Sequence, residues 1–127
     1  MPALNRLPAT RIVATPSALD AAIWPPDRLV FRLAADEVLV TPPAPEVSLN
    51  DPHALIVSDS GFAGLWLPMK EALAFLEHEC EWELPHGRPA FAQGMVAGIA
   101  AKLWFEADRV LIIVPAPFAA DFEERML

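Results

Sequence analysis

The clearest pattern in this chain is a pair of long apolar runs near its C-terminal end. The first run extends from Met95 to Phe105, the second from Val110 to Val114, and a polar break at 106–109 separates them. β-Branched and aromatic residues on both sides of a short polar break are typical of a β-hairpin. Since almost every position in the runs is apolar, we expect both faces of part of this hairpin to be covered, either by helices of the chain or by another subunit.

A second pattern, with a spacing of three to four residues, predicts helices. After Pro68, apolar side chains recur at helical spacing and the positions between them are mostly charged. The apolar positions are Met69, Ala72, Leu73, Leu76 and Cys80. This arrangement predicts an amphipathic helix that begins at the proline. A further helix is predicted at 121–126.

The remaining predicted elements are short. They are a strand at 10–14, a helix at 18–24 capped by 15–17, a hairpin of 29–33 with 38–40, a hairpin of 54–57 with 65–67 that turns through 59–61, and a strand at 82–84. Residues 41–52 are too rich in proline for a helix or a central strand, and we interpret them as an extended connector.

The order of these elements predicts the fold class. Short hairpin turns require antiparallel neighbours, so we expect an α+β fold with mainly antiparallel sheets and helices packed on them. A chain of 127 residues fits a single domain. The connector divides that domain into halves of roughly 1–45 and 53–127, which resemble each other weakly in their order of strands and helices.

Composition excludes several classes of function. A hydrophobic content of 54% and a mean hydropathy of +0.34 exclude a disordered chain. The formal net charge of −8 repels phosphate backbones, so no nucleic-acid partner is expected. The single cysteine cannot form an internal disulfide, which makes the cytoplasm the expected location. No apolar stretch has the length of a membrane span or the form of a signal peptide, so neither is expected.

Few residues form a pattern that is typical of catalysis or metal binding. His78 and Cys80 lie two residues apart with no second cysteine in the chain, so Cys80 is better explained as a small apolar residue than as a zinc ligand. Ser58 to Gly61 cluster two hydroxyls and a carboxylate, but tight turns favour the same residues. Glutamates alternate at 77–83, which is typical of a solvated edge. We therefore expect no catalytic or metal site.

Tryptophans are the remaining candidates for function. Large rings give much contact area, so an aromatic cluster could fill a partner's pocket or stack on a pterin ring, although core packing explains most of them. Trp66 and Trp104 lie within predicted strands, where side chains alternate between the two faces. We therefore consider these two residues candidates for a partner surface.

Several segments together resemble a known family. The segments are Ala72–Leu76, Cys80–Pro85, Pro89–Gly94 and Pro115–Ala119, with Ala35–Val40 and Ala54–Ser60 upstream. In order and spacing they resemble the gamma subunit of heterotetrameric sarcosine oxidase, which has the folate-binding fold of the aminomethyltransferases. The resemblance covers roughly residues 28–126. Where the family usually has a helix, this chain has its proline-rich connector, and we expect the loss to leave an exposed face.

The resemblance implies two functions. One is a non-catalytic accessory or assembly subunit, because in that family the larger subunits carry the flavin and folate chemistry. Its partners would be the larger subunits of an amine-oxidising flavoprotein complex, or further copies of the chain. The alternative is a homo-oligomeric module that binds tetrahydrofolate or another small molecule, which would need an acidic residue and an arginine in one pocket. A family aspartate expected in this role aligns with Val57. The resemblance also implies two β-α-β halves that exchange strands.

Overall fold

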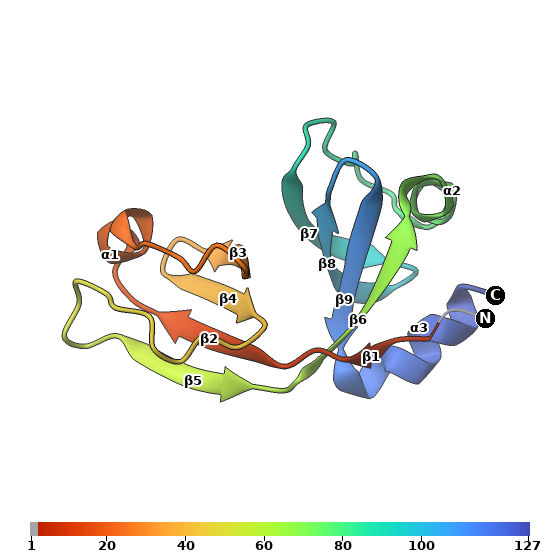
Figure 1. Ribbon diagram of the computed structural model, residues 1–127. Helices are drawn as coiled ribbons and strands as arrows, with labels where there is room; N and C mark the ends of the chain where they lie inside the picture. The colour runs from red at the N-terminus through yellow and green to blue at the C-terminus, as the bar shows by residue number, and fades with distance from the viewer. Residues whose placement is uncertain (1–2) are drawn as a thin grey trace. The chain divides into compact units, whose positions relative to one another are not determined.

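The computed structural model describes residues 3–127, which form two antiparallel sheets and three α-helices (Figure 1). The strands are β1 (Asn5–Arg6), β2 (Ala9–Val13), β3 (Leu29–Ala34), β4 (Glu37–Thr41), β5 (Leu55–Asp59), β6 (Phe62–Pro68), β7 (Ala90–Val96), β8 (Ile99–Phe105) and β9 (Arg109–Pro115). The helices are α1 (Pro16–Ala21), α2 (Met69–Glu79) and α3 (Ala119–Arg125), the last preceded by a 3₁₀ turn at Ala116–Phe118. The predicted α+β class with antiparallel sheets is confirmed.

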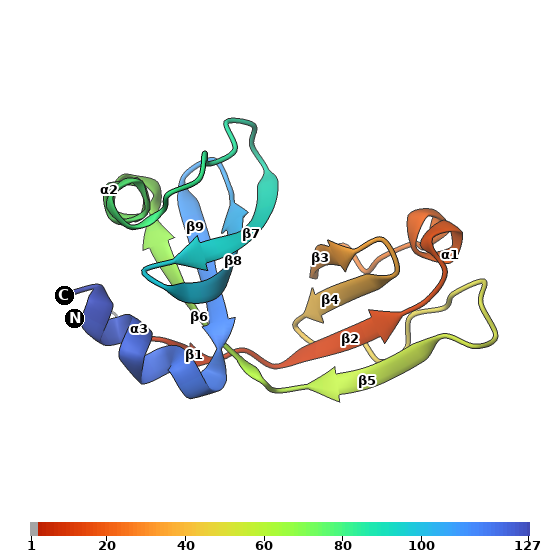
Figure 2. The ribbon, with the colours of Figure 1, turned by 180° about the vertical axis from the view of Figure 1, so that it is seen from behind.

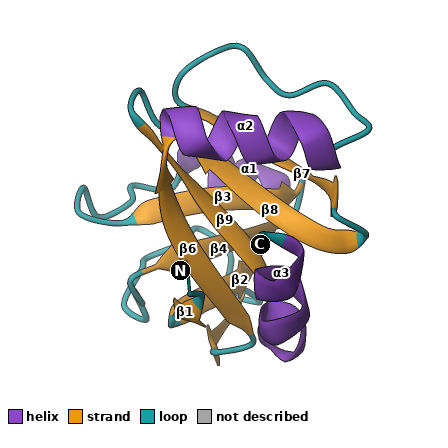
Figure 3. Cartoon of the chain, turned by 90° about the vertical axis from the view of Figure 1, so that its right-hand side faces the viewer, coloured by secondary structure: helices purple, strands orange, loops and turns teal. Residues whose placement is uncertain are grey.

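The first compact unit comprises described residues 3–6 and 61–127. It contains a five-stranded sheet in the order β1-β6-β9-β8-β7. Figure 3 shows α2 and α3 on the same side of this sheet. Alternate side chains of the strands meet the apolar sides of both helices there, and Leu76, Leu103 and Phe122 are fully buried. All five residues from Val110 to Val114 are buried, which confirms that both faces of this strand are covered.

The second compact unit, residues 7–60, contains a four-stranded sheet in the order β3-β4-β2-β5. Helix α1 packs on one face, where Leu19 lies against Ile12 and Val38. Thr15 caps this helix, because its hydroxyl accepts a hydrogen bond from the Ala18 amide at 3.2 Å. The helix ends at residue 21, earlier than predicted, and Pro25–Pro26 prevents it from resuming.

Relative to the sequence halves 1–45 and 53–127, one strand crosses in each direction. Strand β1 precedes the second unit but pairs with β6 of the first, with Asn5 opposite Gly64. Strand β5 follows the connector but pairs with β2 of the second unit, with Ile56 opposite Ile12. Figures 1 and 2 show both pairs, red β1 beside green β6 and yellow-green β5 beside red-orange β2. The units therefore differ from the sequence halves 1–45 and 53–127 by one strand each way.

This exchange makes the predicted hairpin of 54–57 with 65–67 wrong. The two segments lie in different sheets, because β6 pairs with β1 and β9 while β5 pairs with β2. Residues Asp59 to Gly61 consequently connect the two units and do not close a hairpin. The turn residues misled the prediction because aspartate, serine and glycine favour any reversal or bend of the backbone.

The apolar run Met95–Phe105 is also not one strand. It contains the turn of a β7–β8 hairpin, in which Ala97 and Gly98 have φ angles of 51° and 78°. Both values lie in the left-handed region that two-residue hairpin turns require. The predicted pairing across the polar break is confirmed, since β8 and β9 are antiparallel neighbours from Lys102–Ile113 to Phe105–Val110.

The strand predicted at 82–84 is absent, and Trp82 has a different role. Its indole N–H donates a hydrogen bond to the Met95 carbonyl at 2.8 Å. The ring lies so close to Gly94 that a Cβ atom there would be 2.5 Å from the indole Cε2. Gly94 is thus required because it leaves room for the ring. Its backbone conformation does not require glycine, since among the described glycines only Gly98 has a positive φ.

Candidate functional site

The most exposed apolar strand in the structure is β5, which forms one edge of the four-stranded sheet (Figure 2). Leu55, Ile56 and Val57 are 62%, 36% and 52% exposed. Because successive side chains of a strand point to opposite faces, β5 displays apolar side chains on both of its faces. We call these three residues the β5 edge. Clusters of exposed apolar side chains of this kind often mark interaction sites.

The connector explains why the β5 edge is exposed. Residues 42–54 contain no helix or strand, whereas the connector was predicted at 41–52, and Thr41 ends β4. Val47, Leu49 and Ala54 pack against the core around α1, so the connector covers that core and leaves the next three residues uncovered. The exposed apolar residues thus lie directly after the connector.

Asp51 fixes the end of the connector immediately before β5. Its carboxylate accepts hydrogen bonds from the backbone amides of His53 at 2.9 Å and Thr15 at 3.0 Å. These two bonds, that from His53 first, lower the pKa of the Asp51 carboxyl. The start of β5 is therefore tied to the N-terminus of α1.

The opposite edge of the same sheet is protected, in contrast to β5. Strand β3 contains a bulge between Arg32 and Ala34, which interrupts its regular pairing. The Arg32 guanidinium donates to the Ala35 carbonyl at 2.7 Å and forms an ion pair with Asp20 at 2.9 Å. Bulges and charged side chains are common ways to prevent edge-to-edge association. Leu55 to Ser58 contain no charge, proline or glycine that could have this effect.

The structure brings Trp66 and Trp104, the two predicted partner-surface residues, onto one face of the five-stranded sheet. They lie on β6 and β8, and both face Leu111 of the strand between them. Both rings are half-buried, while Leu111 is only 2% exposed. A partner could thus reach the two rings, but not the strand between them.

The Glu106 carboxylate binds both the Trp104 indole and the arginine that stacks on Trp66. Glu106 accepts hydrogen bonds from the Trp104 indole N–H at 3.0 Å and from the Arg109 Nε at 2.8 Å. The Arg109 guanidinium lies 3.7 Å from the centre of the Trp66 ring, at cation–π distance. The hydrogen bond from Arg109, followed by that from Trp104, lowers the pKa of Glu106. This cluster holds both tryptophans in place, so their orientations are fixed in advance of any contact.

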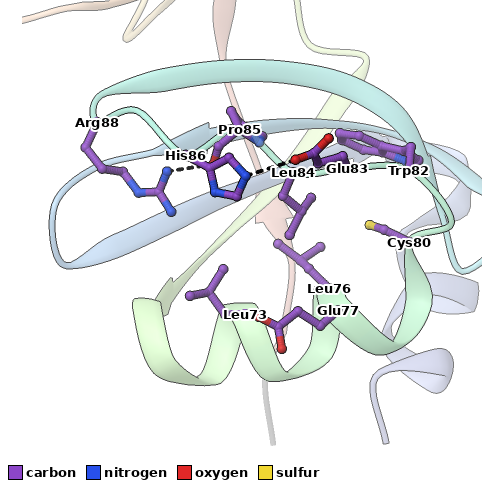
Figure 4. Close-up of a pocket in the computed structure, with 10 residues that line it drawn as sticks. All are labelled: Leu73, Leu76, Glu77, Cys80, Trp82, Glu83, Leu84, Pro85, His86 and Arg88. Carbon is purple, nitrogen blue, oxygen red and sulfur yellow. Dashed lines mark hydrogen bonds and ion pairs between the residues drawn. The ribbon is translucent and has the colours of Figure 1, made fainter.

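A cavity of about 340 Å³ lies between α2 and the loop at 80–89 (Figure 4). Its apolar wall is formed by side chains of the helix and the loop, and its rim carries both acidic and basic groups. The apolar lining includes Leu73, Leu76, Trp82, Leu84 and Pro85, and the polar lining includes Glu77, Glu83, His86 and Arg88. Apolar walls with a few polar groups are typical of small-molecule sites.

Three of the polar side chains at this cavity have partners within the loop. His86 Nε2 lies 3.0 Å from Glu83 Oε1, and both side chains are over 80% exposed, so their attraction is screened by water. Arg88 donates to the Pro85 and Gly87 carbonyls at 2.9 and 2.7 Å, and its guanidinium lies 4.8 Å from the centre of the Phe105 ring. The basic side of the rim is therefore held in place by the loop's own carbonyls.

Cys80 lines the same cavity at the end of α2. Burial, and secondarily the charge of Glu79, raises the pKa of the Cys80 thiol. A raised pKa reduces the thiolate fraction and hence the nucleophilicity of a cysteine. Cys80 is in addition packed against the core of the five-stranded sheet, which is the small apolar role predicted for it.

The other residues considered from the sequence do not form a recognisable reactive group. Within residues 3–127, no group of three or more histidine, cysteine, aspartate or glutamate side chains is arranged to hold a metal ion. His78, considered together with Cys80 from the sequence, lies at the end of α2. In the same described range, no helix combines the length and the apolar character that crossing a membrane requires.

The β5 edge was missed from the sequence as a site. Leu55-Ile56-Val57 was assigned to a hairpin, where a continuous apolar run is typical of a strand covered on both faces. The useful signal was the connector itself, because a proline-rich segment without helix or strand leaves less apolar surface to cover the next strand.

Comparison of the chain with protein-family models, with curated proteins and with solved structures gives no match.

Proposed function

We propose that this chain is a non-catalytic accessory subunit that packs against the larger subunits of an amine-oxidising flavoprotein complex, as the gamma subunit of sarcosine oxidase does. The observation that carries the proposal is the reciprocal exchange of β1 and β5 between the sequence halves 1–45 and 53–127. The sequence resemblance implies such an exchange, and the pairing of these strands cannot be read from local patterns. Agreement on so specific a topology supports the kinship, and the accessory role follows by analogy.

Trp66 and Trp104 provide the proposed contact with the larger subunits. Their rings are half-buried, lie on one face and are held in place by Glu106 and Arg109. Rigid aromatic side chains lose little entropy on binding, so they are favourable centres for an interface.

Co-purification of the tagged chain from its native host tests this proposal. We expect a larger subunit with bound flavin to be recovered, identified by mass spectrometry and by flavin absorbance. Replacing Trp66 and Trp104 together by alanine should reduce the recovery, whereas the matched control Trp24→Ala, in the other unit, should not. Recovery of the chain without any flavoprotein would contradict the accessory role.

The cavity beside α2 favours the second function, a module that binds tetrahydrofolate or a related small molecule. That function needs an acidic residue and an arginine in one pocket, and Glu77, Glu83 and Arg88 line this cavity together. Trp82 lies in the same wall and would report binding through its fluorescence. Unlike the aspartate expected from the family, these acidic residues lie on α2 and the loop that follows it and not on a strand.

Titration with tetrahydrofolate under reducing conditions tests the second function. We expect saturable quenching of tryptophan fluorescence that Glu77→Ala weakens, while Glu124→Ala, a change at another exposed glutamate on α3, leaves it unaltered. Quenching that does not saturate, or that is the same in both variants, would exclude this cavity as the binding site.

A further inference from the structure

We propose that the β5 edge pairs with the β5 edge of a second copy of this chain, in antiparallel orientation about a two-fold axis perpendicular to the sheet. The result would be a continuous eight-stranded sheet in the order β3-β4-β2-β5 followed by its symmetry mate. This inference does not depend on the proposed accessory function.

The first reason to expect a second copy is that the strand is uncharged where it is exposed. Leu55 to Ser58 carry no charge, although the chain as a whole has a net charge of −8. Two copies of an acidic protein repel each other over most of their surfaces, and an uncharged edge is a place where they can approach. Leu55 to Ser58 also lie at a sheet edge, because β2 is the only described strand that pairs with β5, and an edge strand is a template for pairing with another chain.

Symmetry then limits the possible registers. A two-fold axis perpendicular to the sheet keeps each side chain on its own face, so the axis lies midway between one residue and the same residue of the other copy. An axis at Val57 would place Leu55 opposite the charged Asp59 of the other copy. An axis at Leu55 would place Ser58 opposite Pro52, which has no amide to donate.

The register centred on Ile56 is self-complementary. It places Ile56 opposite itself and Leu55 opposite Val57, so each exposed apolar side chain meets another. It also brings His53 opposite Asp59 of the other copy, where an imidazole N–H can donate to a carboxylate. This register therefore combines apolar contacts at its centre with a donor opposite an acceptor at both ends.

Sedimentation equilibrium over a dilution series in the micromolar range tests the dimer. We expect the mass to approach twice 13.9 kDa at high concentration. Val57→Lys would set two lysines close to the axis and should weaken dimerisation by about tenfold or more. Ile23→Lys is the matched control, because Ile23 is 90% exposed in the same unit and lies outside β5. A monomer at all concentrations, or equal dimerisation of both variants, would overturn the proposal.

Disulfide trapping tests the register. In a Cys80→Ser background, Ile56→Cys places two thiols on the axis, where paired Cα atoms of antiparallel strands are about 4.5–5.5 Å apart, within the range of a disulfide. Leu55→Cys and Val57→Cys each place their thiols off the axis, with Cα atoms roughly 8 Å apart, which is too far. We expect mild oxidation to cross-link only the first variant. Preferential cross-linking at 55 or 57, or capture of a different protein by this strand in place of a second copy, would overturn the proposal.

Discussion

Replacement of Gly94 by alanine should destabilise the five-stranded sheet through a single contact. The new Cβ atom would lie 2.5 Å from Cε2 of Trp82 and 2.7 Å from its Cζ2 and Nε1. Non-bonded carbon atoms prefer separations of about 3.5–4.0 Å, so the ring would have to move by about 1 Å. The ring cannot move freely, because its N–H donates to the Met95 carbonyl at 2.8 Å.

The cost can be worked from these two contacts. Overpacking of this kind costs about 1–3 kcal/mol, and loss of the Trp82 hydrogen bond adds about 0.5–1.5 kcal/mol. The change from glycine to alanine returns about 0.4–1 kcal/mol by restricting the unfolded chain. We therefore expect Gly94→Ala to lower the free energy of unfolding by about 0.5–4 kcal/mol.

Urea denaturation followed by circular dichroism measures this loss, and the indole N–H resonance of Trp82 in an ¹H–¹⁵N spectrum reports the movement of the ring. Gly87→Ala is the matched control, since no atom lies within 4 Å of the Cβ position there. In a Trp82→Ala background, Gly94→Ala should cost nothing, because the obstructing ring is gone. An equal cost in both backgrounds, or an unmoved indole resonance in the single variant, would refute the reasoning.

Three further changes test other parts of the structure. Thr15→Ala should cost about 1 kcal/mol in the melting of the second unit, because α1 loses its N-cap, and Thr15→Ser should restore most of it. Leu76→Ala should cost about 2–5 kcal/mol, because it leaves a cavity beneath α2, and denaturation should then separate the melting of the two units. Glu106 has a lowered pKa in the folded state, so its contribution to stability is present above its ordinary pKa of 4.5 and is lost as the pH falls through the folded value. Glu106→Gln should therefore lower the melting temperature at pH 7 and reduce the change in melting temperature below pH 4.5, whereas an unchanged acid profile would show that Arg109 and Trp104 do not stabilise the charged form.

Elements with strong local patterns were predicted well from the sequence. Helix α2 was found because its apolar residues recur at helical spacing and Pro68 marks its start. The β8–β9 hairpin was found because Glu106 to Arg109 interrupt two apolar runs. In both cases residues close in sequence determine the structure, so the local pattern is sufficient to predict the element.

Features that depend on distant residues were missed. Ala97-Gly98 is a weaker turn signal than asparagine–glycine, and it was hidden inside an apolar run. The close approach of Trp82 to Gly94 depends on a loop returning over a strand, which no periodicity reveals. The exposure of Leu55, Ile56 and Val57 depends on where the preceding connector packs. The residues of β5 alone do not reveal this.

The reciprocal exchange of β1 and β5 has a consequence for the order of folding during synthesis. Strand β1 leaves the ribosome early but has no partner until β6, which extends from Phe62 to Pro68, has been made. The four-stranded sheet likewise stays incomplete until Asp59 has emerged. A chain cut between Ser60 and Gly61 would yield one fragment that carries the other's missing strand β1. Two such fragments, expressed together, should find each other and fold as one protein, which makes this position suited to a split reporter.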